Sequence, residues 1–163
     1  MIKKIKSALI SVSDKNNLSL ILRILKKNNV KIISSGGTYK KIKRLGFKCT
    51  EVSDFTGFNE ILDGRVKTLH PKIHAGILNK RKNKKHLKDL KINNFENIDL
   101  IIVNFYPFQQ TLNQTNDHEK IIENIDIGGP TMVRAAAKNY NDVAVITSAE
   151  QYKSLIDQLI KYK

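Results

Sequence analysis

Two segments of this 163-residue sequence combine small residues, hydroxyl groups and a cation in the way that a phosphate site requires. Ser35-Gly36-Gly37-Thr38 stands between a predicted strand and a predicted helix. Glycine lets backbone N–H groups approach an anion closely, and a helix N-terminus carries about half a positive charge. Ser11-Val12-Ser13-Asp14-Lys15 follows an earlier strand in the same way and adds the cation. Either segment could instead be an ordinary turn and helix cap.

A third segment, Arg65-Val66-Lys67-Thr68-Leu69-His70-Pro71, supplies two cations, a hydroxyl group and an imidazole. It lies within residues 53–76, which show little periodicity and contain three glycines. A loop of this length inside a compact domain is usually functional or disordered. Its charged and histidine side chains favour a functional loop, with a solvated loop as the alternative.

Later strands are followed by further polar and aromatic residues. Asn104-Phe105-Tyr106-Pro107-Phe108 comes at a strand end, where its rings could face a ligand or join the core. Asp126-Ile127-Gly128-Gly129-Pro130 places a carboxylate beside a turn at a helix start, where an aspartate could equally be a cap. Lys138 ends an alanine-rich helix, where the helix dipole favours a cation whether or not it has a function.

The sequence predicts neither a metal site nor a disulfide. The single cysteine, Cys49, excludes an intrachain disulfide and zinc sites built on Cys₄ or Cys₂His₂. The four histidines form no ligand set, because Pro71 stands between His70 and His74 and opposes a shared helix.

Apolar, β-rich runs alternate along the chain with helical patterns. Strands are predicted at residues 8–12, 30–33, 48–52, 100–103 and 143–146. Helices are predicted from residue 18 to the Asn28-Asn29 break, at 38–45 with Gly46 as the stop, at 118–124 after Asp117, at 130–138, and after the capping-box pair Ser148 and Gln151. This alternation predicts an α/β fold, a parallel sheet covered by helices on both faces as a three-layer sandwich. Because ligands of such folds bind at the carboxyl ends of strands, residues 11–15, 34–38 and 104–107 should share one edge.

Length and composition limit the class of protein. A chain of this size suits one domain, over residues 1–163, with a sizeable core. No apolar run approaches the roughly 20 residues that span a bilayer, and the run after the basic start is too short for a signal peptide. A soluble, cytoplasmic protein without a membrane partner is therefore expected.

The formal net charge of +14 raises the question of nucleic-acid binding. The excess is mostly lysine, with 24 Lys against 5 Arg, whereas arginine is preferred for bidentate recognition of phosphates and bases. No zinc-finger spacing and no aromatic RNA-binding signature accompanies it, so no nucleic-acid partner is predicted. The lysine-rich stretch 79–91 is interpreted as a solvated loop or helix face, with a partner site as the alternative.

Seven segments in this order resemble the IMP cyclohydrolase domain, the N-terminal part of the bifunctional AICAR formyltransferase/IMP cyclohydrolase of purine biosynthesis. They are Ala8-Leu-Ile-Ser-Val-Ser-Asp-Lys15, Ser35-Gly-Gly-Thr38, Glu51-Val-Ser-Asp-Phe-Thr-Gly57, Asp63-Gly-Arg-Val-Lys-Thr-Leu-His-Pro71, Asn104-Phe-Tyr-Pro-Phe108, Glu123-Asn-Ile-Asp-Ile-Gly-Gly-Pro-Thr131 and Arg134-Ala-Ala-Ala-Lys-Asn139. The resemblance extends from about Lys6 to Tyr152 and is therefore nearly chain-wide.

The resemblance implies a methylglyoxal-synthase-like fold and the last step of purine biosynthesis. In that step 5-formamidoimidazole-4-carboxamide ribotide (FAICAR) closes its ring and loses water to give IMP. The carboxamide nitrogen attacks the formyl carbon, and a hydroxyl group is then expelled as water. The resemblance implies no metal and no cofactor, with FAICAR and IMP as the small-molecule partners.

The resemblance also implies which residues form the site. Its catalytic positions match Lys67, Tyr106, Asp126 and Lys138. The substrate phosphate is expected among Ser13, Lys15, Ser35, Gly37, Thr38, Arg65 and Thr68, and the base beside Asn104, Asp126 and Gly128. Asp126 would take the amide proton and Lys67 would stabilise the formyl oxygen, while Tyr106 and Lys138 would orient groups and relay protons.

The chain departs from the intact family because the formyltransferase domain is absent from it. Folate-dependent formyl transfer is therefore not expected, and the oligomeric state stays open, with a homodimer as one arrangement. An alternative of the same fold is a non-catalytic regulatory domain that binds a nucleotide phosphate and needs no catalytic residues. Methylglyoxal synthase is a further rival, which should lack segments 65–71 and 126–134.

Overall fold

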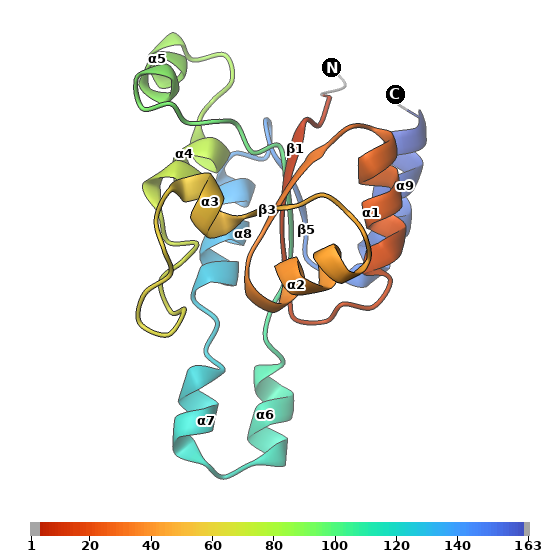
Figure 1. Cartoon of the computed structure of the whole chain (residues 1–163), viewed down its shortest axis with the longest axis vertical. Coiled ribbons are helices and arrows are strands. Elements are labelled where there is room, and N and C mark those ends of the chain that lie inside the picture. Colours follow the sequence, from red (N-terminus) through yellow and green to blue (C-terminus); the bar gives the residue numbers. More distant parts are fainter. Residues whose placement is uncertain (1–3, 162–163) are drawn as a thin grey trace.

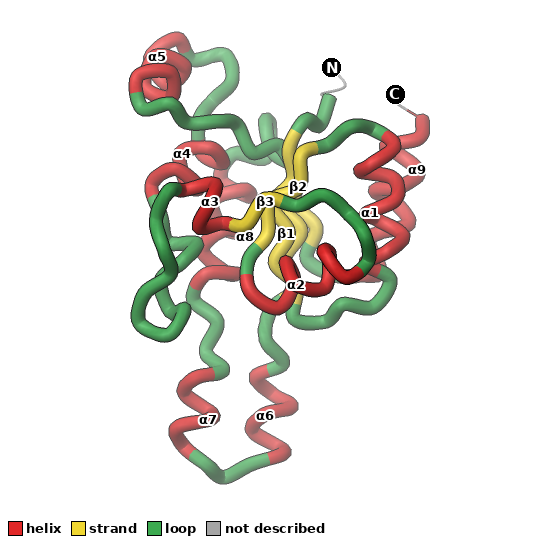
Figure 2. Tube along the Cα trace, in the orientation of Figure 1, coloured by secondary structure: helices red, strands yellow, loops and turns green. Residues whose placement is uncertain are grey.

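The computed structural model describes residues 4–161 and has a five-stranded sheet at its centre. The strands are β1 (Ser7–Val12), β2 (Lys31–Ser34), β3 (Thr50–Glu51), β4 (Leu100–Asn104) and β5 (Ala144–Ile146). Their order is β3-β2-β1-β4-β5, and every neighbouring pair is parallel. Figure 2 shows these strands in yellow between two groups of helices. The predicted parallel α/β sheet is confirmed.

Helices cover both faces of the sheet. One face packs against α1 (Leu18–Lys27), α2 (Gly36–Arg44) and α9 (Tyr152–Lys161), which follows the 3₁₀ turn η1 (Ala149–Gln151). The other face packs against α3 (Val52–Thr56), α4 (Pro71–Leu78) and α8 (Gly128–Lys138). The central strand β1 serves both cores, because successive side chains point to opposite faces. Ile10 enters the first core and Leu9 the second, and both side chains are fully buried.

Three helices lie outside these layers, as Figure 1 shows. Helix α5 (Lys84–Ile92) projects near the amino ends of the strands, whereas α6 (Phe108–Gln114) and α7 (His118–Glu123) form an arm beyond the carboxyl ends. Asp117 caps α7 as predicted, since its Oδ1 accepts the backbone N–H of Lys120 at 3.3 Å. None of the helices within residues 4–161 has the length and apolar character needed to cross a membrane.

The prediction of one long loop over residues 53–76 is wrong at both ends of the segment. Helix α3 occupies its start, so Val52 opens a helix and does not end a strand, and α4 occupies its end. Pro71 is the first residue of α4, where its missing N–H is not needed. His70 caps this helix, because its Nδ1 accepts the backbone N–H of Lys72 at 3.1 Å. A five-residue helix such as α3 is too short to show a periodic apolar pattern.

Two helices also begin two residues earlier than predicted. Helix α2 begins at Gly36, where a turn up to Thr38 was expected, and α8 begins at Gly128 and not at Pro130. Of the two alternatives left open for the aromatic rings after β4, the one that places them in the core is not supported. Phe105 is 47% exposed and Phe108, the first residue of the unpredicted helix α6, is 37% exposed.

At the amino ends of the strands, Arg81 ties neighbouring segments together. Its guanidinium donates to three backbone carbonyl oxygens at 2.9 to 3.2 Å and lies 3.3 Å from Oδ1 of Asp99. Asp99 in turn accepts the backbone N–H groups of Lys6 and Ser7 at 2.9 and 3.2 Å. The side chain of Arg81 is only 16% exposed, so the stretch 79–91 is not uniformly a solvated face.

The single cysteine lies half-buried in the first core. Burial raises the pKa of the Cys49 thiol to about 12, with a further contribution from Glu51 and an opposing one from Lys43. Because the thiolate is the nucleophilic form, a thiol that stays protonated at neutral pH has little reactivity. Cys49 is therefore a structural residue.

Candidate active site

The carboxyl ends of the strands hold the N-terminus of α2, which begins directly after β2. The first backbone bond within this helix runs from the N–H of Tyr39 to the carbonyl oxygen of Ser35 at 3.2 Å. The N–H groups of Gly36, Gly37 and Thr38 therefore have no helical acceptor. Gly36 has a φ of 53°, which favours glycine, and the hydroxyl group of Ser35 makes no capping bond. These donors and the helix dipole form an anion cradle.

Two lysine ammonium groups lie over this cradle. A Cβ atom on Gly37 would lie 3.9 Å from Nζ of Lys15, and one on Gly36 would lie 3.5 Å from Nζ of Lys67. Lys15 also donates to the backbone carbonyl of Ser13 at 2.9 Å, which holds its ammonium group at the end of β1. Because the positive end of a helix repels cations, two ammonium groups beside it create a positive charge that an anion would offset.

Lys67 has one carboxylate partner within the described residues. Oε2 of Glu60, on the same loop, lies 3.5 Å from its Nζ. Gly64 makes room for this ammonium group, because a Cβ atom there would lie 3.1 Å from Nζ and its φ is 85°. The Glu60 side chain is 59% exposed, so the pair contributes little to stability. The sequence analysis missed Glu60, since no periodic pattern relates it to Lys67.

Thr68 anchors the same loop to the first turn of α8. A Cβ atom on Gly128 would lie 2.5 Å from Oγ1 of Thr68, so only glycine allows this approach. His74 of α4 lies behind the loop. Burial lowers the pKa of the His74 imidazole, and a hydrogen bond with the backbone of Thr68 acts in the opposite sense. Burial thus favours the neutral form of the imidazole, and its hydrogen bond with Thr68 links α4 to the loop.

Asp126 lies at the N-terminus of α8, next to the position where Thr68 is held. Its Oδ1 accepts the backbone N–H of Gly129 at 2.9 Å, so the carboxylate does cap the helix. A Cβ atom on Gly129 would lie 2.5 Å from Oδ2, which makes glycine necessary at this position too. Oδ2 has no hydrogen-bond donor within residues 4–161 and can accept a proton from a ligand.

Two predicted ligands instead hold the backbone of the cradle. The hydroxyl group of Thr38, which is buried, donates to the carbonyl oxygen of Val12 at 2.9 Å and accepts its N–H at 3.1 Å. The side-chain amide of Asn104 accepts the N–H groups of Ser13 and Asp14 at 2.6 and 3.0 Å and donates to Asp14 at 2.9 Å. These bonds use the polar groups of both side chains. Thr38 thereby joins α2 to β1, and Asn104 joins the end of β4 to the loop that follows β1.

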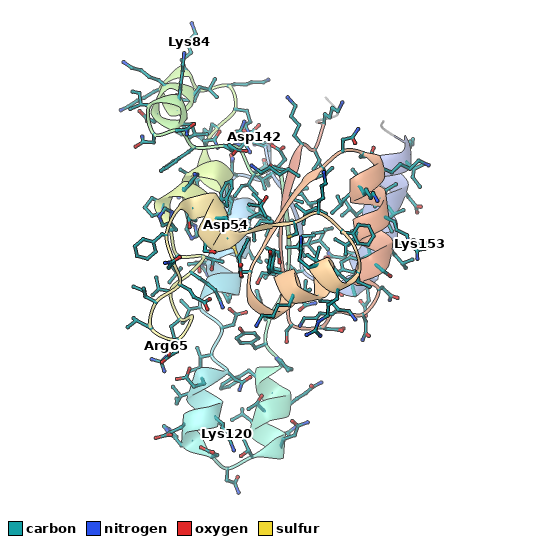
Figure 3. All side chains as sticks on the ribbon, in the orientation of Figure 1. Asp54, Arg65, Lys84, Lys120, Asp142 and Lys153 are labelled. Carbon is teal, nitrogen blue, oxygen red and sulfur yellow. The ribbon has the colours of Figure 1, made fainter. Side chains whose placement is uncertain are left out.

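Arg65 does not reach the cradle in this structure. Its guanidinium forms an ion pair with the carboxylate of Glu123 at the end of α7. Figure 3 shows Arg65 at the outer turn of its loop. The pair joins this loop to the arm, and the sequence analysis missed it because 58 residues separate the partners.

Lys138 is also not brought to the cradle, whereas Tyr106 follows β4 at the carboxyl edge. Tyr106 lies between β4 and α6 and is 48% exposed. Lys138 is exposed at the last position of α8, ten residues after Gly128 at the first. A helix rises 1.5 Å per residue, so about 15 Å separates the two positions along the axis. Lys138 therefore lies near the amino ends of the strands, at the opposite edge.

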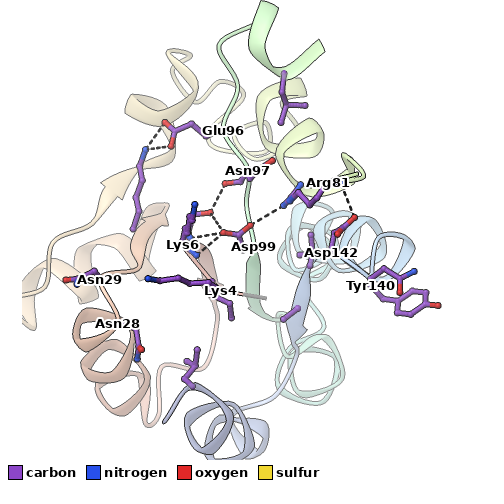
Figure 4. Close-up of a pocket in the computed structure, with 18 of the residues that line it drawn as sticks. Lys4, Lys6, Asn28, Asn29, Arg81, Glu96, Asn97, Asp99, Tyr140 and Asp142 are labelled. Atoms are coloured by element: carbon purple, nitrogen blue, oxygen red, sulfur yellow. Dashed lines mark hydrogen bonds and ion pairs between the residues drawn. The ribbon is translucent and has the colours of Figure 1, made fainter. Parts of the chain in front are cut away.

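A broad basin of about 1400 Å³ occupies that opposite edge, with Arg81 and Asp99 among the residues that line it (Figure 4). Its carboxylates are engaged, because Asp99 pairs with Arg81 and Glu96 pairs with Lys31 at 2.8 Å. No helix N-terminus with free N–H groups lies among the residues, all within 4–161, that line this basin. The convergence of donors and cations at the carboxyl edge makes that edge the candidate active site.

Comparisons with known proteins agree with the fold. A family profile described as "MGS-like domain" matches residues 17–131. A solved structure titled "Crystal structure of ForH" superposes with a TM-score of 0.84 at 28% identity, covering 96% of this chain and 79% of that one.

Curated proteins named "Bifunctional purine biosynthesis protein PurH" are also similar over nearly the whole chain. The one from Acetivibrio thermocellus is 55% identical over 156 residues, which are 95% of this chain and 30% of that protein. The one from Clostridium acetobutylicum is 52% identical over 157 residues, 96% of this chain and 32% of that protein. The chain thus spans about a third of the length of these relatives. The resemblance found in the sequence is confirmed, and the chain belongs to the family of MGS-like domains.

Proposed function

We propose that this chain is an IMP cyclohydrolase, which closes FAICAR to IMP with loss of water. The observation that carries the proposal is the convergence of two ammonium groups, from Lys15 and Lys67, on the N-terminus of α2. This arrangement suits the dianionic phosphate of a ribotide. The names of the PurH relatives support purine biosynthesis as the setting.

The substrate phosphate binds at the cradle. The free N–H groups at the start of α2, the hydroxyl group of Ser35 and the ammonium group of Lys15 donate to it. Ser13 lies beside Lys15, and Thr68 on the facing loop completes the enclosure. Arg65 joins them only after leaving Glu123.

Ring closure needs a base at the amide nitrogen and a positive group at the formyl oxygen. Oδ2 of Asp126 takes the amide proton as the nitrogen attacks the formyl carbon, and Nζ of Lys67 stabilises the negative charge on the oxygen. The former formyl C–O bond then breaks as a C=N bond forms to the formamido nitrogen, which loses its proton. The oxygen leaves as water with this proton and the one from the amide. Gly128, which allows the close approach of Thr68, lies beside this carboxylate. The imidazole ring of the substrate binds there, and Tyr106 orients it. Lys138 has no part in this scheme, because it lies at the other end of α8.

This reaction is a dehydration without a redox step, so it requires neither a metal nor a cofactor. FAICAR and IMP are the proposed partners, and neither a nucleic acid nor a membrane is among them. We assign the chain as a single cyclohydrolase domain and infer that it works in the cytoplasm. In the longer relatives, the formyltransferase activity would supply the FAICAR that this domain consumes.

Changing Lys15 to alanine is expected to raise the KM for FAICAR at least about tenfold and to lower kcat less. The ammonium group binds the phosphate equally in the ground state and the transition state, and a hydrogen bond to a charged group contributes about 1.5–3 kcal/mol. Steady-state kinetics, followed by the absorbance of IMP, measure both constants. Lys40→Ala, on the exposed side of α2, is the matched control. A lower kcat with an unchanged KM would contradict the phosphate role.

A further inference from the structure

A hairpin formed by residues 60–67, in the loop between α3 and α4 (Figure 1), carries Lys67 to the anion cradle. An antiparallel bridge closes it, because the N–H of Ile61 donates to the carbonyl oxygen of Val66 at 3.1 Å and the N–H of Val66 donates back at 3.3 Å. Residues directly opposite each other in such a pair have their side chains on one face. The next pair outward is Glu60 and Lys67, whose Oε2 and Nζ atoms lie 3.5 Å apart. The hairpin therefore places this carboxylate opposite this ammonium group.

The turn of this hairpin has an unusual backbone. Leu62, Asp63 and Gly64 all have a positive φ, of 54°, 53° and 85°. A positive φ is uncommon for a leucine, and such a backbone persists where the surrounding structure holds it. At Gly64 the backbone passes close to the ion pair, since a Cβ atom there would lie 3.1 Å from Nζ of Lys67 and 3.5 Å from Oε2 of Glu60. The turn is thus shaped to the pair and does more than connect α3 to α4.

The ammonium group of Lys67 occupies a position that repels it. It lies beside the positive N-terminal end of α2, only 3.5 Å from where a Cβ atom on Gly36 would be, and the ammonium group of Lys15 lies at the same turn. Like charges repel, and the long, flexible side chain of a lysine can carry its charge into the solvent. Among residues 4–161, Glu60 accepts the single hydrogen bond that this ammonium group donates. Glu60 is therefore the group that can restrain Lys67 at this position.

We propose that Glu60 is a positioning residue, which holds the ammonium group of Lys67 at the N-terminus of α2. The inference rests on the proposed function, in which this ammonium group stabilises the negative charge on the formyl oxygen. Such stabilisation requires a positive group that is already in place when the charge develops. The pair is too exposed to contribute much to the stability of the fold, so its effect lies in the position of the cation. Glu60 acts through Lys67 and takes no proton from the substrate.

Glu60→Gln is expected to lower kcat for FAICAR at least about tenfold, the loss that a displaced catalytic group causes, and to leave KM unchanged or lower. The amide keeps the size of the side chain but loses the charge that restrains Lys67. Removing a negative charge near the cradle favours the anionic substrate, so KM does not rise. Asp63→Asn is the matched control, because it removes an exposed carboxylate of the same turn and asparagine tolerates a positive φ. Both of its kinetic constants should stay within about twofold of the wild type.

An NMR measurement tests the position of Lys67 without any turnover. In a chain that is isotope-labelled at the lysine Cε atoms, Lys67→Arg identifies the signal of this residue. A restrained methylene group gives two distinct Hε shifts, which should merge in Glu60→Gln and stay distinct in Asp63→Asn.

Two distinct shifts that persist in Glu60→Gln would overturn the proposal, and so would a raised KM with an unchanged kcat or an equal loss of kcat in both variants. A wild-type chain without turnover would contradict the proposed function alone, because the NMR signal still shows whether Glu60 holds the ammonium group of Lys67.

Discussion

Changing Asp126 to asparagine is expected to lower the turnover of FAICAR at least about a hundredfold, the range in which a positioned general base contributes. The amide retains an oxygen that can accept the N–H of Gly129, which the carboxylate accepts at 2.9 Å. The helix cap therefore survives, while the carboxylate proposed to take the amide proton is lost. Steady-state kinetics at saturating FAICAR measure the loss.

Asp117→Asn is the matched control for this substitution. Asp117 also caps a helix through Oδ1, but it lies on the arm at the start of α7. Its replacement should leave the turnover within about twofold, because no proton transfer is assigned to it. A near-normal rate for Asp126→Asn would contradict the assigned base, and an equal loss in both variants would assign the effect to helix capping.

Changing Arg81 to alanine is expected to lower the free energy of unfolding by about 3–5 kcal/mol, the usual result of removing one partner of a buried ion pair. The change leaves Asp99, whose side chain is only 17% exposed, without its cation. It also leaves three backbone carbonyl oxygens without the guanidinium donors that they accept at 2.9 to 3.2 Å. Urea unfolding followed by circular dichroism measures the change.

Lys82→Ala provides the control for Arg81, because the neighbouring lysine is exposed and has no such bonds within residues 4–161. Its effect should stay within about 0.5 kcal/mol. A loss below about 1 kcal/mol for Arg81→Ala would show that the guanidinium is not needed to hold the amino ends of the strands.

The anion cradle can be predicted from the sequence because all of its parts are local. A strand, two glycines, a hydroxyl residue and a helix stand next to one another from residue 30 to residue 45, and the alternation of strands and helices places Lys15 at the same edge. The sheet is predictable for a similar reason, since the largely buried strands β1 and β4 are short, mostly apolar runs.

The partners of individual side chains could not be predicted in the same way. The contacts of Arg65 with Glu123 and of Thr38 with Val12 join segments that are far apart in the sequence, and no periodic pattern predicts such contacts. Asn104 has the residue type of a ligand, yet its amide is used by the backbone of the loop after β1. Lys138 was grouped with Lys67 and Asp126, which lie at the carboxyl edge, but the eleven-residue helix α8 carries it to the opposite one.

The most direct test of the proposed reaction mixes the purified chain with FAICAR and follows IMP by ultraviolet absorbance, with and without EDTA. We expect IMP to form at a rate that EDTA leaves unchanged, because the proposed base is Asp126 and the proposed positive group is Lys67. The absence of turnover in a chain that still binds IMP would contradict the proposal and indicate a nucleotide-binding module. Turnover that EDTA abolishes would contradict the metal-free chemistry.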